Sequence, residues 1–92
     1  MSLNNILIEA VKEAKDCNFE KIELVEEDNN VELYFIQGDQ GIGRVNNDIK
    51  DELRNIKRKD IQKLKKDLNV KDIKLNEYQH FGDWARKIEI FI

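Results

Sequence analysis

The chain has 92 residues, which is the size of one compact domain with a single modest core, and we expect residues 1–92 to form one domain. No apolar run approaches the roughly 20 residues of a membrane-spanning helix, which excludes membrane insertion by such a helix. The single cysteine, Cys17, excludes an internal disulfide and a zinc site built from cysteines, and it is typical of the reducing cytoplasm.

The net charge of −3 hides an uneven distribution of charge along the chain. Residues 1–48 hold eleven acidic and four basic residues, whereas residues 49–92 hold eight acidic and twelve basic residues. Much of the positive charge lies in one basic stretch, where a single acid, Asp60, accompanies the bases Arg54, Lys57, Arg58, Lys59, Lys63, Lys65 and Lys66. This stretch is either a solvated helix face or a surface for an acidic partner.

The first predicted element is an amphipathic helix from about Asn4 to Asp16. Charged residues take one side of this helix, and the apolar side is formed by Leu7, Ala10, Val11 and Ala14. The helix is expected to end near Asn18, because asparagine tolerates the left-handed backbone conformation that commonly closes a helix.

Two predicted strands follow, from Phe19 to Val25 and from Val31 to Gln37, and the turn-forming residues 27–30 between them indicate a hairpin. The second strand is apolar on both sides over its second half, so we expect it to lie centrally or to be covered on each face. A further turn at residues 38–41 precedes a short third strand at residues 42–45.

Beyond this strand the apolar spacing is helical again, but it slips by one residue after Ile56, which predicts a bend or two helices with Asp60 as a candidate N-cap. Ile73 and Leu75 are assigned to a connecting segment, and residues 87–92 alternate as a final strand. The predicted order is α-β-β-(β)-α-(α)-β. This order indicates an α+β fold in which a small antiparallel sheet packs against helices.

Three glycines, Gly38, Gly41 and Gly43, superficially resemble a phosphate-binding loop. Such a loop needs Lys-Ser or Lys-Thr after its last glycine, so that the ammonium reaches the phosphates and the hydroxyl binds magnesium. Here Arg44 and Val45 follow the last glycine. A glycine turn between strands is therefore the better interpretation.

The remaining candidate residues do not make a complete site. His80 has no carboxylate or second imidazole beside it for a metal site or a catalytic pair, and Asp16 disfavours a thiolate at Cys17. Trp84 is interpreted as a core residue. The carboxylates of the hairpin are interpreted as solvated strand faces, and these are Glu20, Glu23, Glu26, Glu27 and Asp28. We therefore expect no enzyme activity, no cofactor and no metal.

Several segments of the chain follow, in order, the pattern of a known domain. Residues 6–11 are I-L-I-E-A-V, residues 31–38 are V-E-L-Y-F-I-Q-G, and residues 66–73 are K-D-L-N-V-K-D-I. This order resembles the PAS-like N-terminal domain of type II secretion and type IV pilus assembly ATPases, whose segments are I-L-x-x-A, V-R-Y-R-I-D-G and K-x-L-x-x-x-D-I. The resemblance runs from Ile6 to Ile92 and implies a PAS-like fold.

In that family, arginines of the second strand and of a P-Q-D-G-R turn approach the nucleotide that the ATPase domain holds. Glu32, Tyr34 and Asp83 stand at or near those positions here, and residues 21–23 replace the D-I-H core of the family. The resemblance therefore implies a noncatalytic module, either an excised or freestanding domain or a divergent relative used for assembly contacts. Its implied partner is a protein of a secretion or pilus assembly machine.

We expect a noncatalytic protein-interaction domain whose candidate interaction surface is formed by Arg54, Lys57, Arg58 and Lys65. Reversing the first three of these charges is expected to slow partner association and to leave the fold intact. The alternative is a module that binds an anion or nucleic acid through the basic helix around residues 54–66. The acidic total charge and the lack of a nearby aromatic stacking platform make nucleic acid the less favoured partner.

Overall fold

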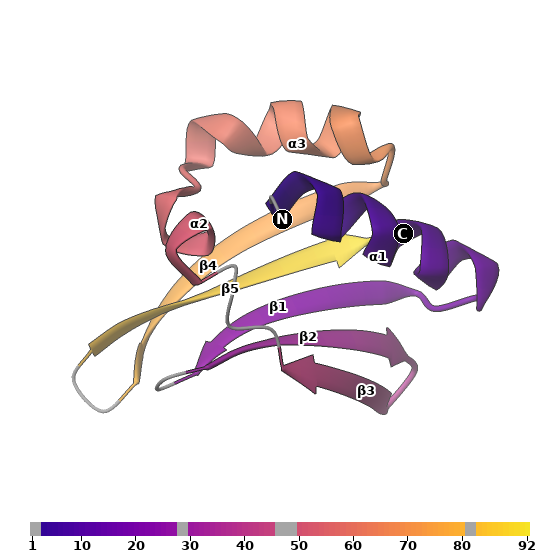
Figure 1. Cartoon of the computed structure of the whole chain (residues 1–92), viewed down its shortest axis with the longest axis horizontal. Helices are drawn as coiled ribbons and strands as arrows, with labels where there is room; N and C mark the ends of the chain where they lie inside the picture. The colour runs from indigo at the N-terminus through magenta and orange to yellow at the C-terminus, as the bar shows by residue number, and fades with distance from the viewer. Residues whose placement is uncertain (1–2, 28–29, 46–49, 81–82) are drawn as a thin grey trace.

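The computed structural model describes residues 3–27, 30–45, 50–80 and 83–92. These residues form, in order, α1 (Leu3–Asp16), β1 (Lys21–Glu27), β2 (Asn30–Gln37), β3 (Gln40–Val45), α2 (Lys50–Asn55), the 3-10 helix η2 (Arg58–Asp60), α3 (Ile61–Leu68), β4 (Asp72–His80) and β5 (Asp83–Phe91). Figure 1 shows the helices in a layer over one face of the sheet. The predicted α+β class with an antiparallel sheet is confirmed.

The strands form one sheet in the order β3-β2-β1-β5-β4, and every neighbouring pair is antiparallel. The chain first builds β1 to β3 as a meander, crosses through α2 and α3, and then returns with the β4–β5 hairpin beside β1 (Figure 1). The first and last strands are therefore neighbours at the centre of the sheet. Ile22 lies opposite Ile90, and Leu24 lies opposite Ile88.

One predicted segment is wrong. Ile73 and Leu75 do not lie in a connecting segment but in β4, which pairs with β5 along its whole length from Asp72 to His80. Two alternating apolar residues are too short a pattern to distinguish a strand from a loop, and the pairing with β5 supplies what the local sequence lacks. The last strand also begins at Asp83, four residues before its predicted start.

Left-handed residues end the two longer helices. Asn18 has a φ of 62° and closes α1, as predicted, and Asn69 has a φ of 52° after α3, where its N–H donates to the carbonyls of Lys65 and Lys66. Asp60 occupies the N-cap position of α3, as predicted, but its side chain makes no capping hydrogen bond there. Its carboxylate instead accepts the backbone N–H of Lys57 at 3.1 Å and stabilises the 3-10 turn.

The core fills the space between the helix layer and one face of the sheet. Helices contribute Leu3, Leu7, Ala10, Val11, Ala14, Leu53, Leu64 and Leu68. The core-facing sheet residues are Ile22, Leu24, Val31, Leu33, Phe35, Ile73, Leu75, Ile88 and Ile90. Because strand residues alternate between faces, the residues between these point to the opposite side, which none of the described helices covers in Figure 1. That uncovered side is called the open face below.

Candidate interaction surface

The basic stretch predicted from the sequence runs from α2 through η2 into α3. Its first residue, Arg54, points back to the sheet. The Nε and Nη2 atoms of Arg54 donate to both carboxylate oxygens of Glu26, at 3.2 and 3.1 Å. Glu26 is 3% exposed, and a buried carboxylate is stable only where hydrogen bonds replace its lost hydration. Arg54 therefore supports the fold by binding a buried carboxylate, although its own side chain is 56% exposed.

A second arginine, Arg86, lies beside this pair and binds the end of α2. Its Nη1 donates to the carbonyl of Leu53 at 3.1 Å and to the carbonyl of Ile56, and its Nη2 lies 3.5 Å from the Glu77 carboxylate. The last carbonyls of a helix have no partner within the helix and carry partial negative charge, so a guanidinium satisfies both needs. Arg86 thus ties α2 to the sheet.

Sequence reasoning missed the roles of Glu26 and Arg86, although the sequence contains a signal for both. Glu26 continues the core-facing alternation of Ile22 and Leu24, and Arg86 continues the alternation of Ile88 and Ile90. A charged residue in the apolar register of a strand points into the protein and needs a partner. Two opposite charges in such registers predict a buried ionic cluster. The interpretation of Glu26 as part of a solvated strand face is wrong.

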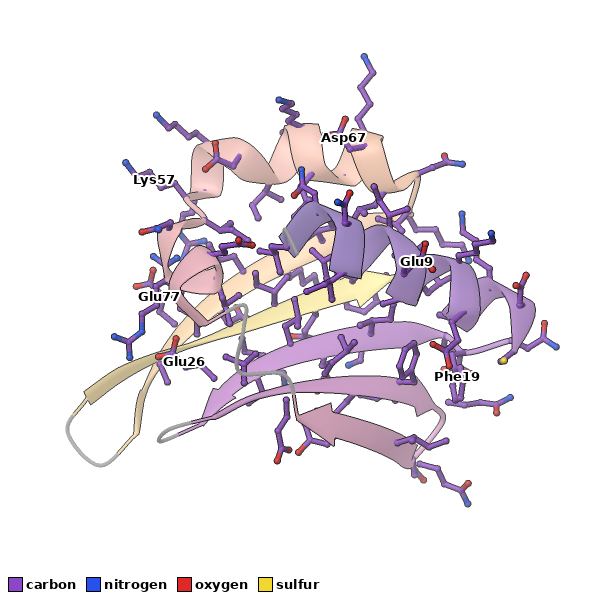
Figure 2. All side chains as sticks on the ribbon, in the orientation of Figure 1. Glu9, Phe19, Glu26, Lys57, Asp67 and Glu77 are labelled. Atoms are coloured by element: carbon purple, nitrogen blue, oxygen red, sulfur yellow. The ribbon has the colours of Figure 1, made fainter. Side chains whose placement is uncertain are left out.

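The other three predicted surface residues lie on the outside, but two of them also have partners within the chain. Arg58 donates to the carbonyl of Leu75 at 3.4 Å, and the Lys65 ammonium lies 3.9 Å from the Asp72 carboxylate. Lys57 is exposed, and Figure 2 shows it pointing away from the helix layer. Three of the four predicted surface residues, Arg54, Arg58 and Lys65, therefore also make contacts within the chain.

The exposed positive charge lies along η2 and α3 instead. We call this surface the lysine ridge, and it consists of Lys57, Lys59, Lys63 and Lys66. Asp60, the acid of this stretch, and Asp67, which directly follows the stretch, line a groove beside the lysine ridge. On the amphipathic α3, Leu64 and Leu68 face the core, and Lys63 and Asp67 line the groove.

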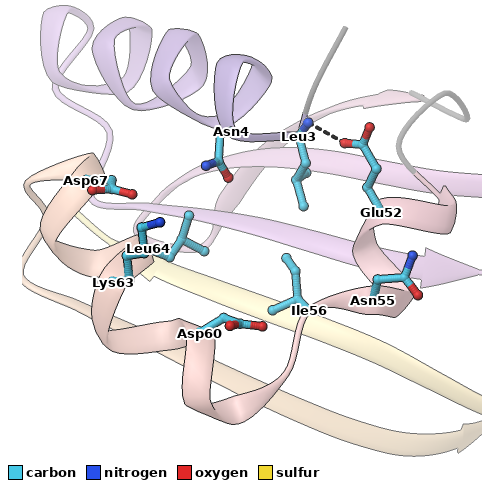
Figure 3. Close-up of a pocket in the computed structure, with 9 residues that line it drawn as sticks. All are labelled: Leu3, Asn4, Glu52, Asn55, Ile56, Asp60, Lys63, Leu64 and Asp67. Carbon is cyan, nitrogen blue, oxygen red and sulfur yellow. Dashed lines mark hydrogen bonds between the residues drawn. The ribbon is translucent and has the colours of Figure 1, made fainter.

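The groove lies between the start of α1, the end of α2, and α3, and its volume is about 400 Å³ (Figure 3). The apolar part of its lining consists of Leu3, Ile56 and Leu64. The polar part consists of Asn4, Glu52, Asn55, Asp60, Lys63 and Asp67. Glu52 also accepts the backbone N–H of Leu3, which joins α1 to α2 at the groove (Figure 3). A cavity of this size can hold one large apolar side chain of a partner.

The open face carries a network of ion pairs. The Lys21 ammonium lies 2.7 Å from the Glu23 carboxylate and 3.1 Å from that of Glu89, and Lys87 lies 3.5 Å from Glu23. The pKa of Lys21 is raised above its ordinary value, first by the hydrogen bond to Glu23 and then by Glu89, against the lowering effect of burial. These charges neutralise one another, so this face attracts a charged partner less than the lysine ridge does.

The structure describes the backbone of the three glycines, but not every other candidate side chain. Gly38 has a φ of 60° in the turn between β2 and β3, and Gly41 and Gly43 lie within β3, which is not a phosphate-binding loop. The side chains of His80 and Trp84 lie outside the described residues. Among the side chains that are described, no three histidines, cysteines or acids gather as a metal site would require.

No helix within the described ranges is long and apolar enough to cross a membrane. No family model matches this chain, and no curated protein or solved structure matches it.

Proposed function

We propose that this chain is a noncatalytic protein-interaction domain that binds a partner through the outer side of its helix layer. The observation that supports this proposal most directly is the groove of about 400 Å³, whose apolar lining opens to solvent beside the lysine ridge. An apolar cavity rimmed by charges suits an amphipathic protein segment. The partner we propose presents one large apolar side chain to the groove and acidic residues to the lysines.

The two parts of this surface make different contributions to binding. An apolar anchor that enters the groove removes its own surface and part of that of Ile56 from water, and such burial supplies affinity. Each exposed ion pair at the lysine ridge contributes only about 0–1 kcal/mol. The summed positive potential nevertheless orients an acidic partner and accelerates its association.

The sequence resemblance adds the kind of assembly in which such a domain works. It implies a PAS-like module and a partner from a secretion or pilus assembly machine, in the cytoplasm. This part of the proposal is based on the resemblance and on the lone, exposed thiol of Cys17, which suits a reducing compartment. Its direct test is to purify the candidate machine component and to measure whether it binds this chain.

A photo-crosslinking experiment tests the position of the interface. A crosslinking amino acid at Asn55, which is exposed and lines the groove, should capture the partner. The same amino acid at Lys12, which is exposed on α1 away from the groove lining, should capture it poorly. Equal capture at both positions would place the interface elsewhere.

The captured partner then allows a matched charge experiment. The variant Lys59→Glu/Lys63→Glu reverses two charges at the lysine ridge and groove, and Lys12→Glu/Lys71→Glu makes the same change of net charge elsewhere. The first variant should slow association by about tenfold at low salt, and the second should have little effect, since steering depends on where the charge lies. Equal rates for the two variants would contradict the proposal.

Nucleic acid is the second candidate partner, because four exposed lysines follow one another along η2 and α3. The sequence from residue 57 to residue 70 contains no aromatic residue on which a base could stack. Binding through lysines alone is weak, indifferent to sequence and steeply reduced by salt. Fluorescence anisotropy across a salt series tests this, and sequence-selective binding at physiological salt would favour nucleic acid over protein.

A further inference from the structure

The sheet has two edge strands, and they differ in what they present to solvent. The edge strand β4 exposes the charged side chains of Asp72, Lys74 and Glu77. The edge strand β3 exposes Gly41, Ile42 and Gly43 in its middle, and Ile42 is 57% exposed. Charged side chains on an edge hinder the pairing of another strand, whereas an apolar edge invites it.

The register of β2 shows which backbone groups of β3 face outward. The backbone N–H of Glu20 donates to the carbonyl of Ile36, so Ile36 directs its backbone groups toward β1 and its neighbour Phe35 directs them toward β3. Phe35 lies opposite Ile42, and Ile36 lies opposite Gly41. Ile42 therefore bonds to β2, while the N–H and C=O groups of Gly41 and Gly43 point away from the sheet.

The two glycines keep this edge open. A Cβ at Gly43 would lie 2.7 Å from Cε1 of Tyr34, so the ring of Tyr34 on the open face requires glycine at this position. A Cβ at Gly41 would only reach ordinary contact, 3.6 Å from Cγ1 of Ile36. Figure 1 shows β3 at the lower edge of the sheet, with the helices lying over other strands. A second strand therefore meets bare backbone at Gly41 and Gly43.

We propose that β3 pairs antiparallel with β3 of a second copy of the chain, about a two-fold axis through the Ile42 pair. In this register Gly41 of each copy forms a hydrogen-bonded pair with Gly43 of the other. The two Ile42 residues then form the non-hydrogen-bonded pair between them, where opposite side chains approach most closely. The most exposed large apolar side chain of the described residues becomes covered by its own copy.

The symmetry of the β3 sequence makes a second copy the best occupant of this edge. The segment Gly-Ile-Gly has the same residues in both directions, so one register satisfies both copies at once. The same register sets Gln40 opposite Arg44 of the other copy, so that the two arginines do not face each other. The contact is small, and we expect a weak dimer that forms reversibly with concentration.

Sedimentation equilibrium tests the dimer on the intact chain. From about 10 μM to about 1 mM, the average mass of the wild type should rise from 10.9 kDa toward twice that value. Gly41→Pro removes the outward N–H and should hold the mass at 10.9 kDa, whereas the control Gly41→Ala keeps the N–H and should associate like the wild type. A constant wild-type mass, or a mass that grows beyond twice 10.9 kDa, would overturn the proposal.

A charge exchange at Ile42 keeps the proposal testable if the proline variant fails to fold. Ile42→Glu and Ile42→Lys each place like charges opposite one another across the axis, so each variant alone should remain monomeric. A mixture of the two should associate again, because every mixed pair sets Glu against Lys. If the separate variants dimerise like the wild type, or if the mixture stays monomeric, the two-fold pairing at Ile42 is wrong.

Discussion

Two ionic clusters lie on opposite sides of the same sheet, and they differ in how far water reaches them. On the helix side, Glu26 is 3% exposed and receives two hydrogen bonds from Arg54. On the open face, the side chain of Lys21, which pairs with Glu23 and Glu89, is 23% exposed. The two ion pairs should therefore contribute differently to the free energy of unfolding. The cost of removing one partner grows with the burial of the other.

The largest expected effect is at Arg54. Replacing Arg54 by Ala removes the bidentate pair and leaves the buried Glu26 carboxylate without it, and we expect a loss of about 2–3 kcal/mol in the free energy of unfolding. This value lies below that of a fully buried pair because Arg54 itself is 56% exposed. Urea denaturation measures the loss. The expectation that reversing Arg54 leaves the fold intact is therefore replaced by a stability defect.

A double variant sharpens this prediction. Glu26→Leu together with Arg54→Met removes both charges and fills the site with apolar groups, and its stability should return to within about 1 kcal/mol of the wild type. If Arg54→Ala alone lowers the free energy of unfolding by less than about 0.5 kcal/mol, the buried Glu26 carboxylate is stable without its guanidinium partner. The expected difference between the two clusters would then be wrong.

A smaller loss is expected at Arg86. Arg86→Met keeps much of the length of the side chain but removes the donors to the carbonyls of Leu53 and Ile56, which should cost about 1–2 kcal/mol. Because these contacts hold α2 to the sheet, backbone amide exchange in residues 52–55 should accelerate more than exchange in β1. Uniform acceleration across both segments would show that Arg86 supports the whole fold and not α2 in particular.

The smallest effect is expected on the open face, at Lys21. Lys21→Met should lower the free energy of unfolding by less than about 1 kcal/mol, since all members of the ion-pair network keep contact with solvent. The raised pKa of Lys21 sets the pH dependence. Folding favours the charged ammonium, so its contribution is complete below the ordinary value of 10.5 and disappears as the pH rises through the higher pKa of the folded state.

Thermal unfolding at two pH values measures this contribution. The difference in Tm between the wild type and Lys21→Met should be larger at pH about 8 than at pH about 11.5. About 1 M sodium chloride should also reduce this difference, whereas it should change the effect of Arg54→Ala little, because salt screens exposed pairs more than buried ones. A difference in Tm that grows with pH would contradict the assigned direction of the Lys21 pKa shift.

Local patterns in the sequence were sufficient for much of the fold. The helical spacing of Leu7, Val11 and Ala14 predicted α1, and Asn18 predicted its end. The turn residues between the first strands predicted the β1–β2 hairpin. The change in spacing after Ile56 predicted a bend or two helices, and the structure has two, α2 and α3. These features depend on residues close in sequence, whose periodicity and backbone preferences act before any tertiary contact forms.

The identity of β4 and the role of the basic stretch were decided by tertiary structure. The segment with Ile73 and Leu75 becomes a strand because β5 pairs with it. Arg54 becomes the partner of a buried carboxylate because Glu26 lies across from α2 in the folded chain. Periodicity states which side of an element is apolar, but not which distant segment will cover it. The sequence therefore determined the elements and their apolar sides, while only the packing of segments far apart in the chain decided which charges are buried and which face a partner.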